Sequence, residues 1–234
     1  MGTADGGGLV VRLVRTAERH PDGASLLRAA AAELLAVAPD EVLVEREPSG
    51  RPRLGGAAAG LHASVSHVPG LSAVAVSRVG AVGVDVERLR PLPAAALARR
   101  WFTTAESRWV AARPQEEQPA AFLGLWTQKE AVGKALGTGL SRGGTRRPVR
   151  LGAVPGTELL PVPAGRGMRT ALPDPPEGFV LAVAAGPDAA GVRVEVLTPV
   201  QGPVPRPAAP PGHGGACPSR SGGTRAAGTS GAGA

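Results

Sequence analysis

The sequence predicts an α+β protein in which two pseudo-symmetric α/β subdomains lie in one chain. Of its 234 residues 43% are hydrophobic, which is enough for a buried core in one or two domains. A pattern typical of a helix, followed by three patterns typical of strands, occurs twice, once on either side of residues 83–87. The halves show no sequence identity, so we interpret this as a repeat of architecture.

The first half begins with a predicted strand over residues 9–14 and a helix rich in alanine and leucine over 25–37, which ends before Pro39. Segments 49–52 and 68–70 are typical of turns. They separate three further predicted strands, at residues 42–47, 61–66 and 72–77.

The second half opens with the strand that contains residues 83–87. Predicted helices follow at 94–101, 105–112 and 119–136, and predicted strands at 148–151, 179–185 and 192–197. Residues 152–176 are rich in proline and glycine, which favours a surface loop. We therefore expect an N-terminal subdomain (1–81), a C-terminal subdomain with the candidate metal site (82–198) and a disordered Pro/Gly-rich tail (199–234).

Charge and cysteine content narrow the function classes. The formal net charge is +7, which suits an anionic partner, but no basic run alternates with aromatic residues, so we expect no nucleic-acid partner. The single cysteine, Cys217, allows no internal disulfide, which favours a cytoplasmic location. Because no run of 18 apolar residues occurs, we expect neither a membrane span nor export.

Valines alternate with acids in the segment Gly83-Val84-Asp85-Val86-Glu87. A strand would bury the valines and project Asp85 and Glu87 from its other face, about 6.5–7 Å apart. Two carboxylates at this spacing can share a hard cation. Alone, however, the pattern favours a strand whose polar face meets water, and it is the pairing with the segment at 126–134 that reverses this preference.

Glu130 and Lys134 are four residues apart, so a helix places both on one face, where an acid and an amine can hold a metal and a phosphate oxygen. An alternative is a capping box formed by Thr127 and Glu130. The apolar spacing upstream continues the helix back to Pro119, which would leave Thr127 inside it.

Three other patterns in the sequence suggest a cap, a hydrolase or a zinc site. Thr103 and Glu106 also have the form of a capping box, and for Glu106 capping and a catalytic role both stay open. Ser141 lies in a Gly-x-Ser-x-Gly pattern like that of the serine-hydrolase nucleophile. The nucleophile of such a hydrolase lies between a strand and a helix, whereas this pattern follows a predicted helix, which argues against a hydrolase. The four histidines lack the spacing of zinc ligands.

Taken together, these segments resemble the Sfp-type 4′-phosphopantetheinyl transferases, which activate carrier proteins. The resemblance covers most of residues 20–197 and rests on residues 83–87 and 126–134, with Glu87 and Glu130 43 positions apart. Three lesser segments fall in the family order: Gly50-Arg51-Pro52, Ser64-Val65-Ser66-His67 and residues 101–106.

The resemblance implies that a serine hydroxyl of an apo acyl or peptidyl carrier protein attacks the β-phosphate of coenzyme A and releases 3′,5′-ADP. It assigns Asp85, Glu87 and Glu130 to Mg²⁺. Glu130 would also accept the serine proton and Lys134 would contact the phosphates, so these two are the expected catalytic residues.

The expected coenzyme A contacts are Arg51, Ser66, His67, Lys129, Lys134 and Arg28. Where the family has an arginine near the start of the first helix, this chain has Ala24. Arg28 is one substitute, and Arg19 with His20 is another. We expect a monomer, because one chain supplies both halves of the site. The alternative function is a non-catalytic module of the same fold that binds coenzyme A or a carrier protein.

Overall fold

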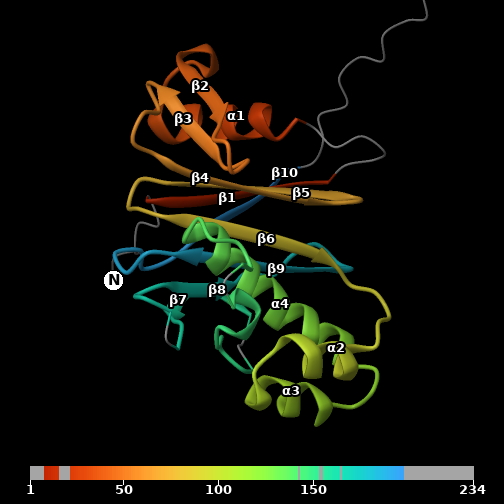
Figure 1. The fold of residues 1–234 in the computed structure, drawn as a ribbon. Helices are drawn as coiled ribbons and strands as arrows, with labels where there is room; N and C mark the ends of the chain where they lie inside the picture. Colours follow the sequence, from red (N-terminus) through yellow and green to blue (C-terminus); the bar gives the residue numbers. More distant parts are fainter. Residues whose placement is uncertain (1–7, 16–21, 142, 153–154, 164, 198–234) are drawn as a thin grey trace, which may run out of the picture. The chain divides into compact units, whose positions relative to one another are not determined.

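The described residues form three sheets with helices beside them (Figure 1). They belong to a computed structural model and comprise residues 8–15, 22–141, 143–152, 155–163 and 165–197. The expected α+β class is confirmed, and each half of the sequence supplies most of the strands of one four-stranded sheet. The tail predicted for residues 199–234 lies outside the described residues.

The first sheet consists of β1 (Leu9–Arg15), β4 (His62–Val68), β5 (Leu71–Ser77) and β10 (Arg193–Leu197). Its strand order is β10-β1-β5-β4. β5 is antiparallel to both β1 and β4, whereas β10 is parallel to β1. The second half of the sequence thus contributes its last strand to the sheet of the first half.

The remaining elements of the first half are α1 (Gly23–Leu35), the short 3₁₀ helix η1 (Pro39–Glu41), β2 (Val42–Arg46) and β3 (Pro52–Gly56). β2 and β3 pair as an antiparallel hairpin. α1 starts at Gly23 because the Asp22 carboxylate accepts a hydrogen bond from the Ala24 amide.

The second sheet consists of β6 (Val82–Arg88), β7 (Gly156–Pro161), β8 (Arg169–Leu172) and β9 (Phe179–Ala185), in the order β6-β9-β8-β7. Its helices are α2 (Ala94–Trp101), α3 (Thr104–Ala111), α4 (Gln118–Ala135) and the 3₁₀ helix η2 (Gly144–Arg146). α4 packs along β6 and β9 (Figure 1).

Most predicted elements are confirmed within two or three residues, and those at 94–101 and 179–185 match the observed bounds. Two predictions are wrong. Residues 148–151 form no strand, and residues 152–176 contain β7 and β8 where a loop was expected. Proline and glycine at both ends of β7 and β8 hid two short strands from the sequence pattern. β8 depends on pairing with β9, and β7 depends on pairing with β8.

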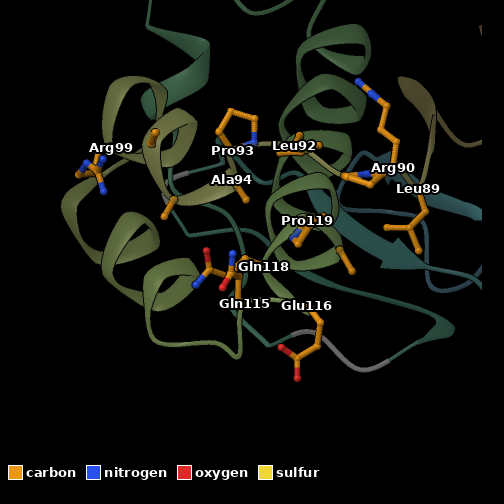
Figure 2. A pocket seen from close by; sticks show the side chains of 14 residues that line it. Leu89, Arg90, Leu92, Pro93, Ala94, Arg99, Gln115, Glu116, Gln118 and Pro119 are labelled. Atoms are coloured by element: carbon orange, nitrogen blue, oxygen red, sulfur yellow. The ribbon is translucent and has the colours of Figure 1, made fainter.

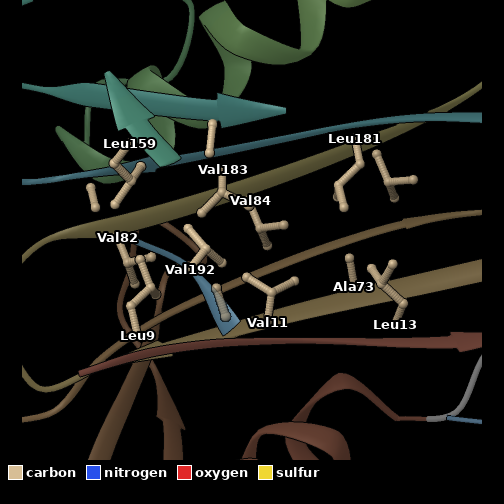
Figure 3. Packing of buried hydrophobic residues seen from close by; sticks show 14 of the residues in the cluster. Leu9, Val11, Leu13, Ala73, Val82, Val84, Leu159, Leu181, Val183 and Val192 are labelled. Atoms are coloured by element: carbon tan, nitrogen blue, oxygen red, sulfur yellow. The ribbon is translucent and has the colours of Figure 1, made fainter. Parts of the chain in front are cut away.

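The two four-stranded sheets pack face to face through alternating aliphatic side chains (Figure 3). Leu9, Val11 and Leu13 of β1 meet Val84 of β6 and Val183 of β9 in this layer. The opposite faces of β5 and β9 pack against α1 and α4, respectively. Each sheet is therefore buried on both faces, which explains why every residue of β5 is buried.

The edge strands β4 and β6 lie side by side and form a seam between the sheets. Serine hydroxyls replace ladder hydrogen bonds there: Ser64 Oγ accepts from the Val84 amide at 3.1 Å, and Ser66 Oγ from the Val86 amide at 3.2 Å. These bonds satisfy amides that a β6 edge would otherwise leave unpaired. They also fix Asp85, which lies between the two valines, at the seam.

Among the described helices, none combines the length and the apolar character needed to cross a membrane.

Candidate active site

Asp85 lies at the centre of the candidate site. As the alternating pattern predicted, Val84 and Val86 point into the core and are buried. Residue Asp85 is 6% exposed, and its Oδ1 accepts from Ser66 Oγ at 2.9 Å and from Lys134 Nζ at 2.8 Å. Its other oxygen, Oδ2, is buried and has no hydrogen-bond partner among the described residues.

α4 supplies the second part of the site. Thr127 is buried inside this helix and donates to the Leu123 carbonyl oxygen at 3.0 Å, so the prediction that it lies mid-helix is confirmed and the capping alternative is wrong. Lys134 Nζ donates to the carbonyl oxygens of Val84 at 3.0 Å and Val65 at 3.3 Å, in addition to Asp85. It therefore connects α4 to both strands of the seam.

Gly83 allows β6 and α4 to approach closely. A Cβ at this position would lie 1.9 Å from the Ala131 carbonyl oxygen, on the backbone of α4. A residue with any side chain would force strand and helix apart. The glycine therefore brings the acids of β6 close to Glu130.

Burial and neighbouring charges raise the pKa values of two of the carboxylates, Asp85 and Glu130. Burial raises the pKa of Asp85 above its ordinary value, and the Lys134 charge only partly opposes this rise. Burial also raises the pKa of the half-buried Glu130, and the negative charges of Asp85 and Glu87 raise it further. Asp85 and Glu87 thus lie near enough to Glu130 for their charges to act on its carboxyl group.

Glu87, the second acid of β6, is partly exposed. Its Oε2 pairs with Arg90 Nη1 at 2.9 Å, an interaction that sequence reasoning missed. Within the described ranges, no three acidic, histidine or cysteine side chains converge as a complete metal cluster. The donor set still suits a hard cation, because the unpartnered Asp85 Oδ2 is a buried oxygen of the kind that Mg²⁺ binds.

A cavity of about 260 Å³ adjoins Lys134. One wall consists of residues from β3 and β4, together with Arg51, which directly precedes β3. The other wall consists of the last turn of α4 and the glycines Gly137 and Gly139 that follow it. Arg51 reaches across, since a Cβ at Gly137 would lie 3.3 Å from its Nη1. The cavity is therefore lined by two cations, Arg51 from the first half of the sequence and Lys134 from the second, which suits an anionic ligand.

Comparisons with known proteins decide the family. The 4′-phosphopantetheinyl transferase superfamily model matches residues 81–157, which contain β6 and α4. The 4′-phosphopantetheinyl transferase psf-1 of Bacillus pumilus is 30% identical over 190 residues, 80% of this chain and 79% of psf-1. The chain belongs to the 4′-phosphopantetheinyl transferase superfamily.

Two further relatives agree. The 4′-phosphopantetheinyl transferase HetI of Nostoc sp. (strain PCC 7120) is 35% identical over 127 residues, 53% of this chain and 54% of HetI. The 4′-phosphopantetheinyl transferase gsp of Aneurinibacillus migulanus is 28% identical over 127 residues, 54% of this chain and 52% of gsp. These two matches span about half the length of the relatives. The resemblance to Sfp-type transferases is confirmed.

The structure disperses the residues that this family resemblance assigned to coenzyme A. Only Arg51 and Lys134 line the 260 Å³ cavity. His67 is exposed near the end of β4, and Arg28 Nε donates to the Val42 carbonyl oxygen at 3.2 Å, on the α1 side of the first sheet. Arg19 and His20 lie outside the described residues.

Ser66 and Lys129 are the two members of this set that face inward. The Ser66 hydroxyl is taken up by Asp85 and the Val86 amide. The Lys129 side chain is fully buried and pairs with Glu106 at 2.7 Å. In this arrangement neither side chain is open to a ligand, because each is enclosed by its own partners.

A larger cavity, of about 860 Å³, opens where β6 ends (Figure 2). Leu89 and Leu92 give it an apolar wall, and Arg90, Arg99 and Glu116 give it charge. Arg90 links the cavity to Glu87 through their ion pair. A partner held there would lie beside the acids of the candidate site.

Proposed function

We propose that this chain transfers the 4′-phosphopantetheine group of coenzyme A to a serine of an apo acyl or peptidyl carrier protein and releases 3′,5′-ADP. The observation that carries the proposal is the meeting of Asp85, Glu87, Glu130 and Lys134 at the seam, beside the Arg51 cavity, in a member of this superfamily. Membership supplies the reaction class, and these residues supply chemistry for it.

The proposed reaction is a displacement at phosphorus. The serine oxygen forms a bond to the β-phosphorus of coenzyme A, and the bond from that phosphorus to the bridging oxygen breaks, so 3′,5′-ADP leaves with the electron pair. Glu130 takes the serine proton. Its raised pKa makes it a stronger base than an ordinary carboxylate, which suits this task.

The other residues position the reactants. Arg51 and Lys134 would hold phosphate oxygens of coenzyme A from opposite walls of the smaller cavity. Asp85, Glu87 and Glu130 would hold Mg²⁺, which supplies charge neutralisation and Lewis acidity at the pyrophosphate when bound.

The carrier serine must arrive from the side that coenzyme A leaves free. The larger cavity next to Glu87 offers such a side, with two arginines for an acidic carrier surface and leucines for an apolar contact. We further propose that the protein acts as a monomer in the cytoplasm, without nucleic acid or membrane as a partner.

The test is a transfer assay. Incubation with coenzyme A, Mg²⁺ and several apo acyl and peptidyl carriers should raise the mass of at least one carrier by one phosphopantetheine group, and Asp85→Ala should abolish the gain. Thermal unfolding adds a binding readout, because Mg²⁺ and coenzyme A raise the Tm of a protein that binds them.

The outcomes separate the alternatives. A Tm increase with coenzyme A, but no mass gain on any carrier, would reject transfer and leave a non-catalytic binding module. Absence of both effects would reject the proposal together with that alternative.

A further inference from the structure

Glu106 and Lys129 form a buried pair that the proposed reaction does not use. The Lys129 side chain is 0% exposed and the Glu106 side chain 2%. Lys129 Nζ lies 2.7 Å from Glu106 Oε1 and 4.8 Å from the centre of the Phe102 ring. Because the pair is closed to solvent, it can affect the reaction only through the protein segments that it contacts.

Both members of the pair have their hydrogen bonds satisfied. Glu106 Oε1 also accepts from the Val149 amide at 3.0 Å, and Oε2 accepts from the amide and hydroxyl of Thr103 at 2.9 and 2.8 Å. Lys129 Nζ also donates to the Arg147 carbonyl oxygen at 2.5 Å. The pair therefore joins the start of α3, the middle of α4 and segment 147–149.

Stability alone is a weak explanation for such a pair. Removing two charges from water is costly, and apolar residues of similar volume often stabilise a core as well as a buried ion pair does. Burial lowers the pKa of Lys129, and the Glu106 contact only partly restores it. The hydrogen bonds of the two charges instead fix α3, α4 and segment 147–149 in one arrangement relative to one another.

The segment most directly fixed is the turn of α4 that carries Glu130. Lys129 precedes Glu130, so a contact that holds Lys129 sets the rotation of α4 about its axis. With a helix radius of about 5–6 Å including side chains, a rotation of about 10° moves a carboxylate by about 1 Å. A displacement of that size can change a rate about 100-fold.

We propose that Glu106 and Lys129 are positioning residues, which hold Glu130 in register with Asp85. This inference rests on the proposed function, in which Glu130 takes the serine proton. The contribution is to the orientation of α4, since neither side chain of the pair reaches the cavity by Lys134.

The test compares Lys129→Met, the double variant Glu106→Gln/Lys129→Met and the control Gln128→Met. Lys129→Met leaves a buried carboxylate without its cation. In the double variant the charge is gone, and the glutamine oxygen can still accept from the Val149 amide. Gln128 is buried like Lys129 and donates to the Arg150 carbonyl oxygen at 3.2 Å, so its replacement loosens the residue next to segment 147–149 without touching α3.

We expect Lys129→Met to lower both Tm and kcat, and the double variant to regain Tm while kcat stays at least about tenfold below wild type. The KM for coenzyme A should change less than about twofold, because positioning of Glu130 acts on the chemical step. Gln128→Met should lower Tm and leave kcat within about twofold.

Recovery of kcat together with Tm in the double variant would reduce the pair to a stability role and overturn the inference. An equal loss of kcat in Gln128→Met would also overturn it, because general loosening would then explain the effect. A crystal structure of the double variant gives a readout independent of activity: α4 should rotate and displace Glu130 from Asp85, and an unmoved helix contradicts the inference. An inactive wild type would instead reject the proposed function.

Discussion

Replacing Gly83 by alanine tests whether the close packing of β6 against α4 creates the site. The new Cβ would lie 1.9 Å from the Ala131 carbonyl oxygen and 2.7 Å from the Ala135 amide nitrogen. Both atoms belong to the helix backbone, so no side-chain rotation can make room. Since Cβ contacts below 3.0 Å are essentially never found, strand and helix must separate by about 1.1 Å, the difference from 1.9 Å.

This separation has two costs. Overpacking of this kind lowers the free energy of unfolding by about 1–3 kcal/mol. The 2.8 Å bond from Lys134 to Asp85 would also lengthen beyond hydrogen-bond range, which adds about 1.5–3 kcal/mol for a charged pair. The same shift moves Glu130 away from Asp85 by about 1 Å, so the transfer rate should fall about 100-fold.

Urea unfolding and the carrier mass assay measure these two effects. Gly124→Ala is the matched control, because Gly124 lies in the same helix and a Cβ there would meet no atom within 4 Å. It should raise the unfolding free energy by about 0.5–1 kcal/mol and leave the rate unchanged. A Gly83→Ala protein as stable and active as wild type would refute the reasoning.

Two other predictions concern the cations of the smaller cavity. Lys134→Met removes the ammonium that donates to Asp85 and to two strand carbonyl oxygens, so the free energy of unfolding should fall by about 2–3 kcal/mol. Transfer should also be lost, and a variant that keeps the wild-type rate would contradict the role given to Lys134. Burial, and then the charge of Arg51, lower the pKa of His62 below its ordinary 6.5 in the folded protein, so the unfolded chain binds more protons and stability falls as pH drops through about 6.5. His62→Gln should flatten that loss in unfolding curves from pH 7 to 5, and 3′,5′-ADP bound at Arg51 should raise the His62 pKa measured by NMR; an unchanged pKa would place the ligand elsewhere.

The parts of the site that the sequence predicted depend on local periodicity. The alternation of valine and acid determines which face of β6 carries Asp85 and Glu87, whatever the strand packs against. The spacing of Glu130 and Lys134 likewise places them on one side of α4. Both inferences hold because neighbouring residues along the chain decide them.

The partners of these residues could not be predicted, because residues distant in sequence supply them. Lys129 directly precedes Glu130, yet Glu106 and the Arg147 carbonyl oxygen draw it into the core. Arg28 fits the charge needed for a phosphate, but α1 packs on the outer face of the first sheet and holds it at β2. The sequence pattern of Thr103 and Glu106 correctly indicated a capping box at the start of α3. It did not indicate that Glu106 also pairs with Lys129.

Under the proposed function, Lys134 would connect phosphate binding to the contact between the two sheets, because it bonds to a strand of each. Its ammonium has three donors, and the carbonyl oxygens of Val65 and Val84 together with Asp85 take all three. A phosphate oxygen bound by Lys134 must therefore replace one of them. The 3.3 Å bond to Val65 is the longest, and Val65 also lines the cavity, so this bond is the one that a phosphate displaces at least cost. We therefore expect a bound phosphate to exchange the contact of Lys134 with β4 for a contact with the ligand, while Lys134 keeps its bond to Asp85.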